Sequence, residues 1–416
     1  MPPLMSLARA ALIFALLCIA AACSMEASPV RRIDETWFRS SLQNDHMTRW
    51  LAVAPTGNGF FRTDFNRQWV AKEKQSGGVI GQTRALYVLS AGYEITQNPA
   101  YLQQVRAGAD FLLTHFRDKE FGGWFEAVGA DGAVLNPNKR LYAQVFAIFA
   151  LAHAYRVTHD TRYLDAANAT RVVIQDKFAD GMGGFRAGMN REFTQTKLDN
   201  SQNPVMHLFE ALLALYDAGG SPEILKDARK VGDFVVYKLL QGAADGSAFI
   251  PENYDSTWKP LGQEQGGLVD IGHQFEWAFM LGAATERGLP PLYADVADRL
   301  LKFGVEKGYD RVDSGVFTSA MANGEINRKK GYWQQAEALR ALMYHAVARQ
   351  RQDLAPLITQ MSEFVRSEFV DETNGGWYLA PKSECRRHSC PDIQPDGYHM
   401  VALHREAIRL VEQYRR

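Results

Sequence analysis

Hydrophobic positions repeat with the period of an amphipathic helix along most of the chain. In residues 162–177, apolar side chains fall at Leu164, Ala167, Val172 and Ile174, with charged residues between them. This spacing is near 3.6 residues and places the apolar side chains on one face of a helix. Comparable amphipathic helices are predicted at residues 99–116, 222–240, 290–305 and 354–369. Extended β patterns are nearly absent beyond short hairpins, so helices dominate the predicted fold.

A second kind of helix alternates with the amphipathic ones and is apolar nearly all round. Residues 142–155 show it most clearly, and the polar break Thr158-His159-Asp160 separates them from the amphipathic helix that follows. A helix without a polar face must be buried on all sides. Each pair is therefore predicted to form a helical hairpin with one fully buried and one half-buried helix.

The hairpins belong to an internal repeat. A short motif that ends in an aromatic residue recurs every 60 to 68 residues, by subtraction of the residue numbers, and the second copy (Gly122-Gly123-Trp124-Phe125) closely matches the last (Gly375-Gly376-Trp377-Tyr378). The six copies are Gly59-Phe60, Gly123-Trp124, Gly184-Phe185, Ala248-Phe249, Val316-Phe317 and Gly376-Trp377. Even spacing of this kind is typical of stacked structural repeats.

Six hairpins of this length can stack into an open solenoid or close into a ring. An inner ring of buried helices inside an outer ring of amphipathic helices satisfies both hydrophobic patterns. We therefore predict an all-α fold, an (α/α)6 barrel of six helical hairpins with short β-hairpins in the loops at one mouth. The barrel forms a single catalytic domain over residues 30–416, and the open solenoid remains the alternative.

The N-terminus reads as a targeting segment. Residues 1–22 contain a basic residue, Arg9, and an apolar run at residues 10–22 that is shorter than the roughly 20 residues needed to span a bilayer. The sequence Ala20-Ala21-Ala22-Cys23 fits an ordinary signal-peptidase site and also a lipoprotein signal, in which Cys23 becomes the lipid anchor. We favour the lipoprotein reading. The protein is then exported, periplasmic or membrane-anchored, and contacts the membrane only through that anchor.

Two cysteines remain in the body of the chain. Cys385 and Cys390 lie close together in a polar segment, and in an oxidising compartment such a pair is expected to form a disulfide. His388 lies between them, which leaves a metal site as an alternative. Two Cys and one His make a poor zinc set, so the disulfide is favoured.

Polar residues gather near the start of each buried helix, at equivalent places in the repeat. Equivalent places on parallel inner helices lie at one end of a barrel, and buried polar groups are costly unless they are paired or bind a ligand. Six such clusters therefore predict a polar binding cleft at one mouth. The clusters are Gln82 and Arg84; Lys139, Tyr142 and Gln144; Asn203, His207 and Glu210; His273, Glu276 and Trp277; Trp333, Gln334 and Glu337; and Tyr398, His399 and His404.

Two of these clusters share a spacing with chemical meaning. In His207-x-x-Glu210 and in His273-x-x-Glu276, a carboxylate stands one helical turn from an imidazole. A carboxylate there can accept the imidazole N–H and make the other ring nitrogen more basic. A single pair of this kind favours a structural hydrogen bond. Two pairs in equivalent repeats, with His399 across the ring, favour acid–base chemistry.

The same segments resemble a known family. Residues 203–211, Asn-Pro-Val-Met-His-Leu-Phe-Glu-Ala, and residues 272–277, Gly-His-Gln-Phe-Glu-Trp, are similar to signatures of the N-acylglucosamine 2-epimerase superfamily. The second segment looks closer to the mannose-isomerase and acylglucosamine-epimerase branches than to the cellobiose branch. Weaker matches are Gln82-x-Arg84, Lys139-x-x-Tyr142-x-Gln144, Trp333-x-Gln335-x-Glu337 and Tyr398-His399. The segment at residues 381–395, with its two cysteines, departs from the family pattern.

The resemblance implies a role for each matched residue. His273 and His399 form the general acid/base pair, and His207 helps to open the sugar ring. Arg84 holds a substrate oxygen, and Glu210 and Glu276 orient their histidines. The remaining substrate-binding residues are Tyr142, Gln144, Asn203, Trp277, Trp333 and Glu337.

Histidine suits the chemistry of a carbon acid. Removal of the C2 proton of an open-chain aldose gives a cis-enediolate, and a His with a pKa near neutrality can serve as base and then as acid. Helix N-termini at the mouth are expected to lower the pKa of these histidines. Reprotonation at C2 gives the epimer and at C1 the ketose, and the sequence leaves open which product forms and from which sugar. No cofactor and no metal are expected.

Composition limits the partners. The formal net charge is −1, which argues against nucleic acid because phosphate neutralisation needs an excess of Lys and Arg. The expected partner is a mono- or disaccharide, bound by a monomer or homodimer.

Three other functions remain open. A glycoside hydrolase or lyase on the same barrel would rely on acidic pairs, for which Glu126, Asp199, Glu210 and Glu276 are available. The others are a non-catalytic sugar-binding lipoprotein and a metal enzyme with His and Glu ligands.

Overall fold

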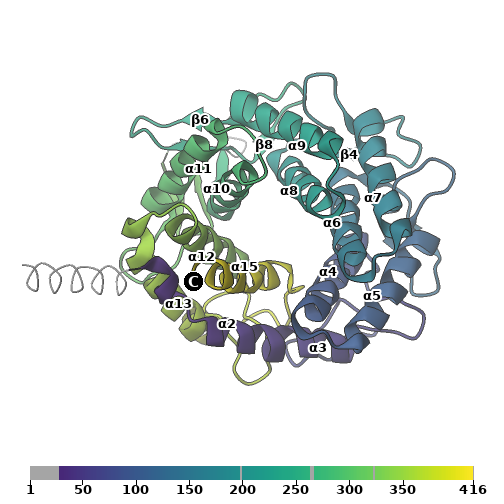
Figure 1. Cartoon of the computed structure of the whole chain (residues 1–416), viewed down its shortest axis with the longest axis horizontal. Coiled ribbons are helices and arrows are strands. Elements are labelled where there is room, and N and C mark those ends of the chain that lie inside the picture. The colour runs from purple at the N-terminus through teal and green to yellow at the C-terminus, as the bar shows by residue number, and fades with distance from the viewer. Residues whose placement is uncertain (1–27, 197–198, 263–266, 322–323, 416) are drawn as a thin grey trace, which may run out of the picture.

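The computed structural model describes residues 28–196, 199–262, 267–321 and 324–415. The predicted signal peptide and Cys23 lie outside the described residues. Helices form two concentric rings, and short strands lie in the loops between them (Figure 1). Within the described ranges, no helix has the length and apolar character that a membrane span requires.

The inner ring consists of one helix from each repeat. Neighbouring inner helices pack side by side around the centre, and the last packs against the first, which closes the ring (Figure 1). The inner helices are α4 (Val79–Thr96), α6 (Leu141–Thr158), α8 (Gln202–Gly219), α10 (Ile271–Thr285), α12 (Tyr332–Val347) and α15 (Tyr398–Tyr414). Most residues of these inner helices are buried, as the hydrophobic pattern predicts.

Five outer helices follow the first five inner helices, close to the predicted ranges. They are α5 (Pro99–Phe111), α7 (Thr161–Val173), α9 (Pro222–Phe234), α11 (Leu292–Phe303) and α13 (Ala355–Glu368). The first four continue into one π-helical turn each, η3 (Leu112–Phe116), η4 (Ile174–Phe178), η5 (Val235–Leu239) and η7 (Gly304–Gly308). The break between α6 and α7 has a local cause, because His159 adopts a positive φ of 55° and the Asp160 side chain caps α7.

The sixth outer position is filled from the other end of the chain. After η1 (Pro29–Arg32), α2 (Glu35–Ser41), η2 (Leu42–Met47) and α3 (Thr48–Val53) form this layer, and α2 packs on α15. Arg39 of α2 bonds Glu412 of α15 at 2.5 Å, and the Trp37 and His404 rings lie 5.4 Å apart. The closed (α/α)6 barrel is confirmed, and the open solenoid is not formed.

Short antiparallel strands connect the outer helices to the inner ones. β9, for example, leads directly into α10 and pairs with β10, with Asp270 opposite Ser319. The strands are β1 (Ala127–Val128), β2 (Val134–Asn136), β3 (Lys139–Arg140), β4 (Gly188–Met189), β5 (Asn200–Ser201), β6 (Gln241–Gly242), β7 (Ala248–Phe249), β8 (Asn253–Tyr254), β9 (Leu268–Asp270), β10 (Ser319–Met321) and β11 (Ile326–Asn327). Two short helices, η8 (Gln352–Leu354) and α14 (Lys382–Arg387), complete the described elements.

A glutamine clamp fixes the repeat loop in four of the six units. The fourth residue of the inner helix is a buried Gln whose side-chain amide bonds both the N–H and the C=O of one loop residue. The four pairs are Gln82 with Phe61, Gln144 with Trp124, Gln274 with Ile250 and Gln335 with Val316. The prediction that Gln144 binds substrate is therefore wrong, because both ends of its amide are occupied by Trp124.

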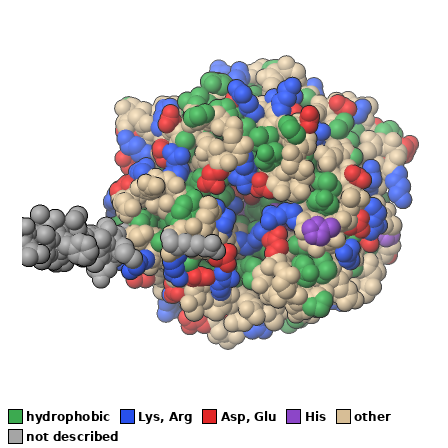
Figure 2. All heavy atoms as spheres, viewed as in Figure 1, with side chains coloured by type: hydrophobic (Ala, Val, Ile, Leu, Met, Phe, Trp, Pro, Cys, Tyr) green, Lys and Arg blue, Asp and Glu red, His purple; other side chains and the backbone are tan. Residues whose placement is uncertain are grey.

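The barrel holds a half-open cavity of about 380 Å³ that is lined by side chains from all six inner helices, mostly from beyond their first two turns, among them Glu210 and Arg340. The face of the molecule in Figure 2 is hollowed at its centre, and basic and acidic side chains gather around the hollow. The centre of the barrel is therefore polar, unlike the apolar layer between its two rings.

Candidate active site

The predicted site residues occupy two rows near the N-terminal ends of the inner helices. The second residue of an inner helix supplies Tyr142, Asn203, Trp333 and His399, and the sixth supplies Arg84, His207, Glu276 and Glu337. Residues four apart share a helix face, so both rows point in the same direction on their helices. His273 stands at the third position of α10. The structure thus brings the predicted residues together at one mouth.

His273 is fixed by a glutamate from a loop. The Nδ1–H of His273 donates to Oε2 of Glu252 at 2.7 Å, and the Gln202 amide donates to the same oxygen at 2.8 Å. Glu276, predicted to orient His273, instead lies near the other nitrogen, with its Oε2 at 3.9 Å from Nε2. The predicted pairing is wrong because position 276 points toward the ring centre, whereas Glu252 approaches from the loop between β7 and β8.

The carboxylates around His273 raise the pKa of its imidazole. Burial lowers the pKa of His273, but the negative charges of Glu252 and Asp270 outweigh burial and raise the pKa to about 10. His273 is therefore an imidazolium at neutral pH. The expectation that helix N-termini lower the pKa of this histidine is wrong, because the two carboxylates exert the larger effect.

His399 is fixed by a glutamate from the neighbouring helix. Its Nδ1 lies 2.8 Å from Oε1 of Glu337, and Arg340 donates to the other Glu337 oxygen at 3.2 Å. In a neutral ring, an Nδ1–H that donates to Glu337 leaves the lone pair on Nε2. Glu337 is fully buried. We therefore assign it the orientation of His399, in place of the substrate contact that the sequence predicted.

The Trp333 ring packs against both histidines. Its ring centre is 5.0 Å from that of His273 and 5.3 Å from that of His399. The imidazole centres therefore lie no more than about 10 Å apart, and both imidazoles contact the same indole. The two histidines belong to a single site.

His207 forms a third arrangement with the predicted partner. Its Nδ1 lies 3.0 Å from Oε2 of Glu210, which also accepts the Tyr398 hydroxyl at 2.5 Å. Burial lowers the pKa of His207 despite the opposing effect of Glu210, so the ring is neutral at neutral pH. The Tyr142 ring packs edge-on against it, with centres 5.1 Å apart.

Arg84 is held rigidly above the aromatic wall of the site. Its guanidinium forms an ion pair with Asp396 and donates to the Tyr142 hydroxyl at 2.8 Å. It also lies 4.7 Å from the centre of the Tyr398 ring. Burial lowers the pKa of Arg84, but the effects of Asp396 and Tyr142 are larger, and the net pKa is raised. The guanidinium therefore stays charged.

The surroundings of the Glu276 carboxyl group favour its protonated form. Burial and the nearby charge of Glu337 raise its pKa well above the ordinary value. Its Oε2 has no hydrogen-bond partner. Glu276, Glu337 and His399 offer ligand atoms that all lie within 4.8 Å of one another, so these three residues could hold a divalent cation. A proton on Glu276 relieves the same repulsion between the two carboxyl groups.

Trp277 is a support and not a wall of the pocket. It is fully buried, and its indole N–H donates to Oε1 of Gln202 at 2.7 Å, which orients the Gln202 amide toward Glu252. The prediction that Trp277 binds substrate is therefore wrong. Asn203 is partly exposed at the mouth, and its side-chain oxygen has no hydrogen-bond partner.

Five site residues were missed by the sequence reasoning, namely Gln202, Glu252, Arg340, Asp396 and, as a partner of Glu210, Tyr398. For Glu252 a signal existed. It stands two residues after the clamped Ile250, as Glu126 stands two residues after the clamped Trp124. Alignment of the repeats on the glutamine clamp would have placed Glu252 at the mouth.

The remaining predicted features lie outside the histidine cluster. Cys385 and Cys390 are joined by a disulfide on the segment that precedes α15. Glu126 forms an ion pair with Arg140, and Asp199 is exposed. Neither carboxylate therefore joins Glu276 in a buried acid pair of the kind that the hydrolase alternative requires.

Comparisons with known proteins find related sequences and a similar fold. The family described as N-acylglucosamine 2-epimerase (GlcNAc 2-epimerase) matches residues 59–402. Cellobiose 2-epimerase of Bacteroides fragilis is 23% identical over 83% of this chain and 91% of its own length. D-mannose isomerase of Thermobifida fusca is 27% identical over 70% of this chain and 75% of its own. The solved structure of cellobiose 2-epimerase from Bacillus thermoamylovorans shares the fold, with a TM-score of 0.81, 20% identity and coverage of 91% of this chain and 99% of that one.

Proposed function

Because the chain belongs to the N-acylglucosamine 2-epimerase family, we propose that it is a sugar epimerase or isomerase that moves the C2 proton of a free aldose. One observation carries the proposal: two imidazoles, each fixed at Nδ1 by its own glutamate, pack against the same indole. Two such groups can reach opposite sides of a planar intermediate. The proposed substrate is a free sugar that resembles mannose, glucose or an N-acetylhexosamine.

The two imidazoles take different roles in the proposed reaction. Nε2 of His399 is the base that takes the C2 proton, and the C–H electron pair moves toward the carbonyl to give a cis-enediolate. His273 is the imidazolium that returns a proton from the other side, because its pKa of about 10 keeps it charged at neutral pH. Delivery to C2 re-forms the C1 carbonyl and gives the epimer, whereas delivery to C1, with the O2 hydroxyl proton moved to O1, gives the ketose. In the reverse direction the two residues exchange roles.

Ring opening and charge stabilisation fall to the neighbouring repeats. His207 is neutral and can relay a proton between the ring oxygen and O1 of the sugar. The Arg84 guanidinium stabilises the negative charge that develops on the enediolate oxygens. Tyr142 and Trp333 form aromatic walls for the sugar, and the unpartnered oxygen of Asn203 can accept a hydrogen bond from a hydroxyl group.

The hydrolase alternative is less favoured by the same geometry. Glu210, Glu252 and Glu337 are each bound to an imidazole, so they serve as orienting groups. A hydrolase needs an acid and a carboxylate free to face the glycosidic bond.

We further propose that residues 1–22 are a signal peptide and that Cys23 carries a lipid anchor. The disulfide between Cys385 and Cys390 fits an oxidising compartment. Fractionation of expressing cells tests this proposal. The unaltered protein is expected in the membrane fraction, and Cys23→Ser is expected in the soluble fraction. An unaltered protein in the soluble fraction would contradict the anchor.

The reaction itself is tested by NMR of the purified protein in deuterated buffer with mannose, glucose and N-acetylated hexosamines. Deuterium at C2 of a new aldose identifies an epimerase, and deuterium at C1 of a ketose identifies an isomerase. If no tested aldose exchanges its C2 hydrogen, the proposal fails. Release of sugar from an aryl glycoside without exchange would support the hydrolase instead.

A further inference from the structure

The charged groups of the site are balanced in pairs. Within the described part of the site, each of three cationic groups has a carboxylate partner: Arg84 has Asp396, His273 has Glu252 and Arg340 has Glu337. A phosphate or carboxylate on a substrate would need an unpaired cation, because a buried charge without a partner is costly. The pair of Arg84 and Asp396 is the most accessible of the three, since a quarter of the Asp396 side chain remains exposed.

Asp396 occupies a repeat position that holds a lysine in two other units. It stands two residues before α15, as Lys139 stands two residues before α6 and Lys330 two residues before α12. Each of these lysines binds an aspartate of its own repeat loop, at 3.0 Å from Asp118 for Lys139 and at 2.8 Å from Asp310 for Lys330. The sixth unit therefore replaces a structural cation by an anion.

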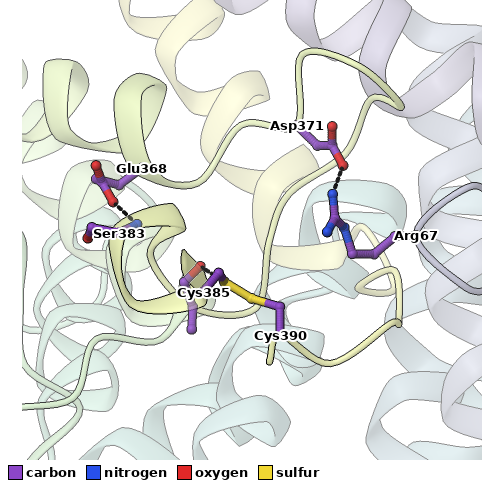
Figure 3. The surroundings of a disulfide bond; sticks show 7 residues. Arg67, Glu368, Asp371, Ser383, Cys385 and Cys390 are labelled. Atoms are coloured by element: carbon purple, nitrogen blue, oxygen red, sulfur yellow. Dashed lines mark hydrogen bonds and ion pairs between the residues drawn. A yellow bond between two sulfur atoms is a disulfide. The ribbon is translucent and has the colours of Figure 1, made fainter. Parts of the chain in front are cut away.

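The structural task of the missing lysine is taken over by the first repeat. Asp371, the loop aspartate of the sixth unit, is bound by Arg67 at 2.7 Å (Figure 3). Because that aspartate already has a cation, position 396 is free to face Arg84. The exchange thus places a carboxylate in the site without leaving Asp371 unpaired.

The segment before Asp396 is tied at both ends. The disulfide between Cys385 and Cys390 closes its first half (Figure 3). In its second half, Asp392 accepts the Arg67 N–H at 3.1 Å, and the Gln394 amide donates to the Arg67 carbonyl at 2.7 Å. Asp396 itself accepts the N–H of Tyr398 at 3.1 Å at the start of α15. These contacts hold the carboxylate in place against Arg84.

We propose that Asp396 is a specificity-determining residue that neutralises Arg84 and so restricts the site to uncharged sugars, excluding sugars that carry a phosphate or carboxylate group. The inference rests on the proposed function, since it concerns which aldose that same site accepts. Arg84 stays oriented toward the sugar by Tyr142, while its excess charge is cancelled by Asp396.

The test compares a neutral hexose that the protein converts with the 6-phosphate of the same hexose. The unaltered full-length protein is expected to prefer the neutral sugar strongly in kcat/KM. Asp396→Asn keeps the size of the side chain and an oxygen that can accept the Tyr398 N–H but removes its charge. It is expected to shift the preference toward the phosphate by about tenfold or more, since one repulsive charge is lost. Asp313→Asn, the same change at an exposed aspartate of another repeat loop, is expected to leave the preference unchanged.

Inhibition by hexitol and hexitol 6-phosphate gives a second readout that does not depend on turnover. The unaltered protein is expected to bind the neutral polyol more tightly, and Asp396→Asn to narrow the difference. Equal inhibition constants for the two polyols with the unaltered protein would overturn the inference, even if Asp396→Asn failed to fold. An unshifted preference in a folded Asp396→Asn protein would overturn it as well. Failure of every sugar to react would instead overturn the proposed function.

Discussion

The two histidines at the centre of the site are held in the same manner but in different electrostatic surroundings. Each donates Nδ1–H to a glutamate, at 2.7 Å for His273 and at 2.8 Å for His399. The glutamate of His399 also receives Arg340, so its negative charge is shared with a cation. Glu252, the glutamate of His273, is bound by the neutral Gln202 and retains its full charge toward the imidazole.

This difference separates two functions of a carboxylate behind an imidazole. Both carboxylates orient the ring, and Glu252, together with Asp270, also raises the pKa of its histidine to about 10. The protein can therefore build an acid and a base from the same two residue types. What distinguishes them is the third residue, Gln202 or Arg340.

Removal of either imidazole is the largest change that the comparison allows. His273→Ala and His399→Ala are each expected to lower kcat by at least about a hundredfold, the usual contribution of an acid–base group. Steady-state kinetics and C2 deuterium exchange measure the effect. His388→Ala, which removes an exposed histidine of the disulfide segment, serves as a control. Near-normal turnover in either variant would remove that histidine from the mechanism.

Glu252→Gln tests the acid side of the comparison. Loss of one negative charge lowers the pKa of His273, so the imidazolium is lost at a lower pH than in the unaltered protein. Below the new pKa the acid form persists. Activity is therefore expected to fall more at pH 9 than at pH 6, by about tenfold or more in the ratio of the two rates. An unchanged pH profile would contradict the assignment of His273 as the acid.

A change in the glutamine clamp is expected to affect the stability of the barrel without affecting the charges of the site. Gln144→Leu leaves a buried N–H and C=O of Trp124 without partners, which is expected to cost about 1–3 kcal/mol of unfolding free energy. Denaturant unfolding measures this loss, and kcat at low temperature is expected to stay within about twofold. Gln103→Leu, on the exposed face of α5, is the matched control. A large loss of kcat in a folded Gln144→Leu protein would give this residue a role in the site after all.

Metal removal is expected to have the smallest effect. If the proton on Glu276 is what balances the carboxyl groups near His399, prolonged treatment with a strong chelator leaves the rate unchanged. Loss of activity that one divalent cation restores would show that Glu276, Glu337 and His399 hold a metal ion. The catalytic base would then be a metal-bound group and not the imidazole of His399.

The helical hairpins could be predicted because the rule behind them is local. A helix such as α6 shows its burial in its own sequence, and the αα turn at Asp160 carries its own cap. The site could be predicted only in part, because its pairs join distant segments. The spacing His-x-x-Glu gives a hydrogen bond at His207, which starts from the sixth position of its helix. At His273 the same spacing starts from the third position, nearer the mouth, where the loop glutamate is closer.

The sixth outer layer had no signal of the same kind. The N-terminal helices join the barrel by packing on α15, and nothing in the sequence of residues 35–53 indicates that they pack there. The role of Asp396 also depends on Arg67 of the first unit, which already binds Asp371. Such exchanges between the first and last units follow from the closure of a ring and are invisible to a repeat-by-repeat reading.

The packing of α2 on α15 has a consequence for how the protein is made. His399 stands on the helix that completes the inner ring, while the outer helix that covers it is synthesised first. A chain emerging from the ribosome carries His273 long before His399, and its α2 must wait without its partner. Catalytic competence is therefore expected to arise late, once residue 399 has been synthesised and the two ends of the polypeptide have met.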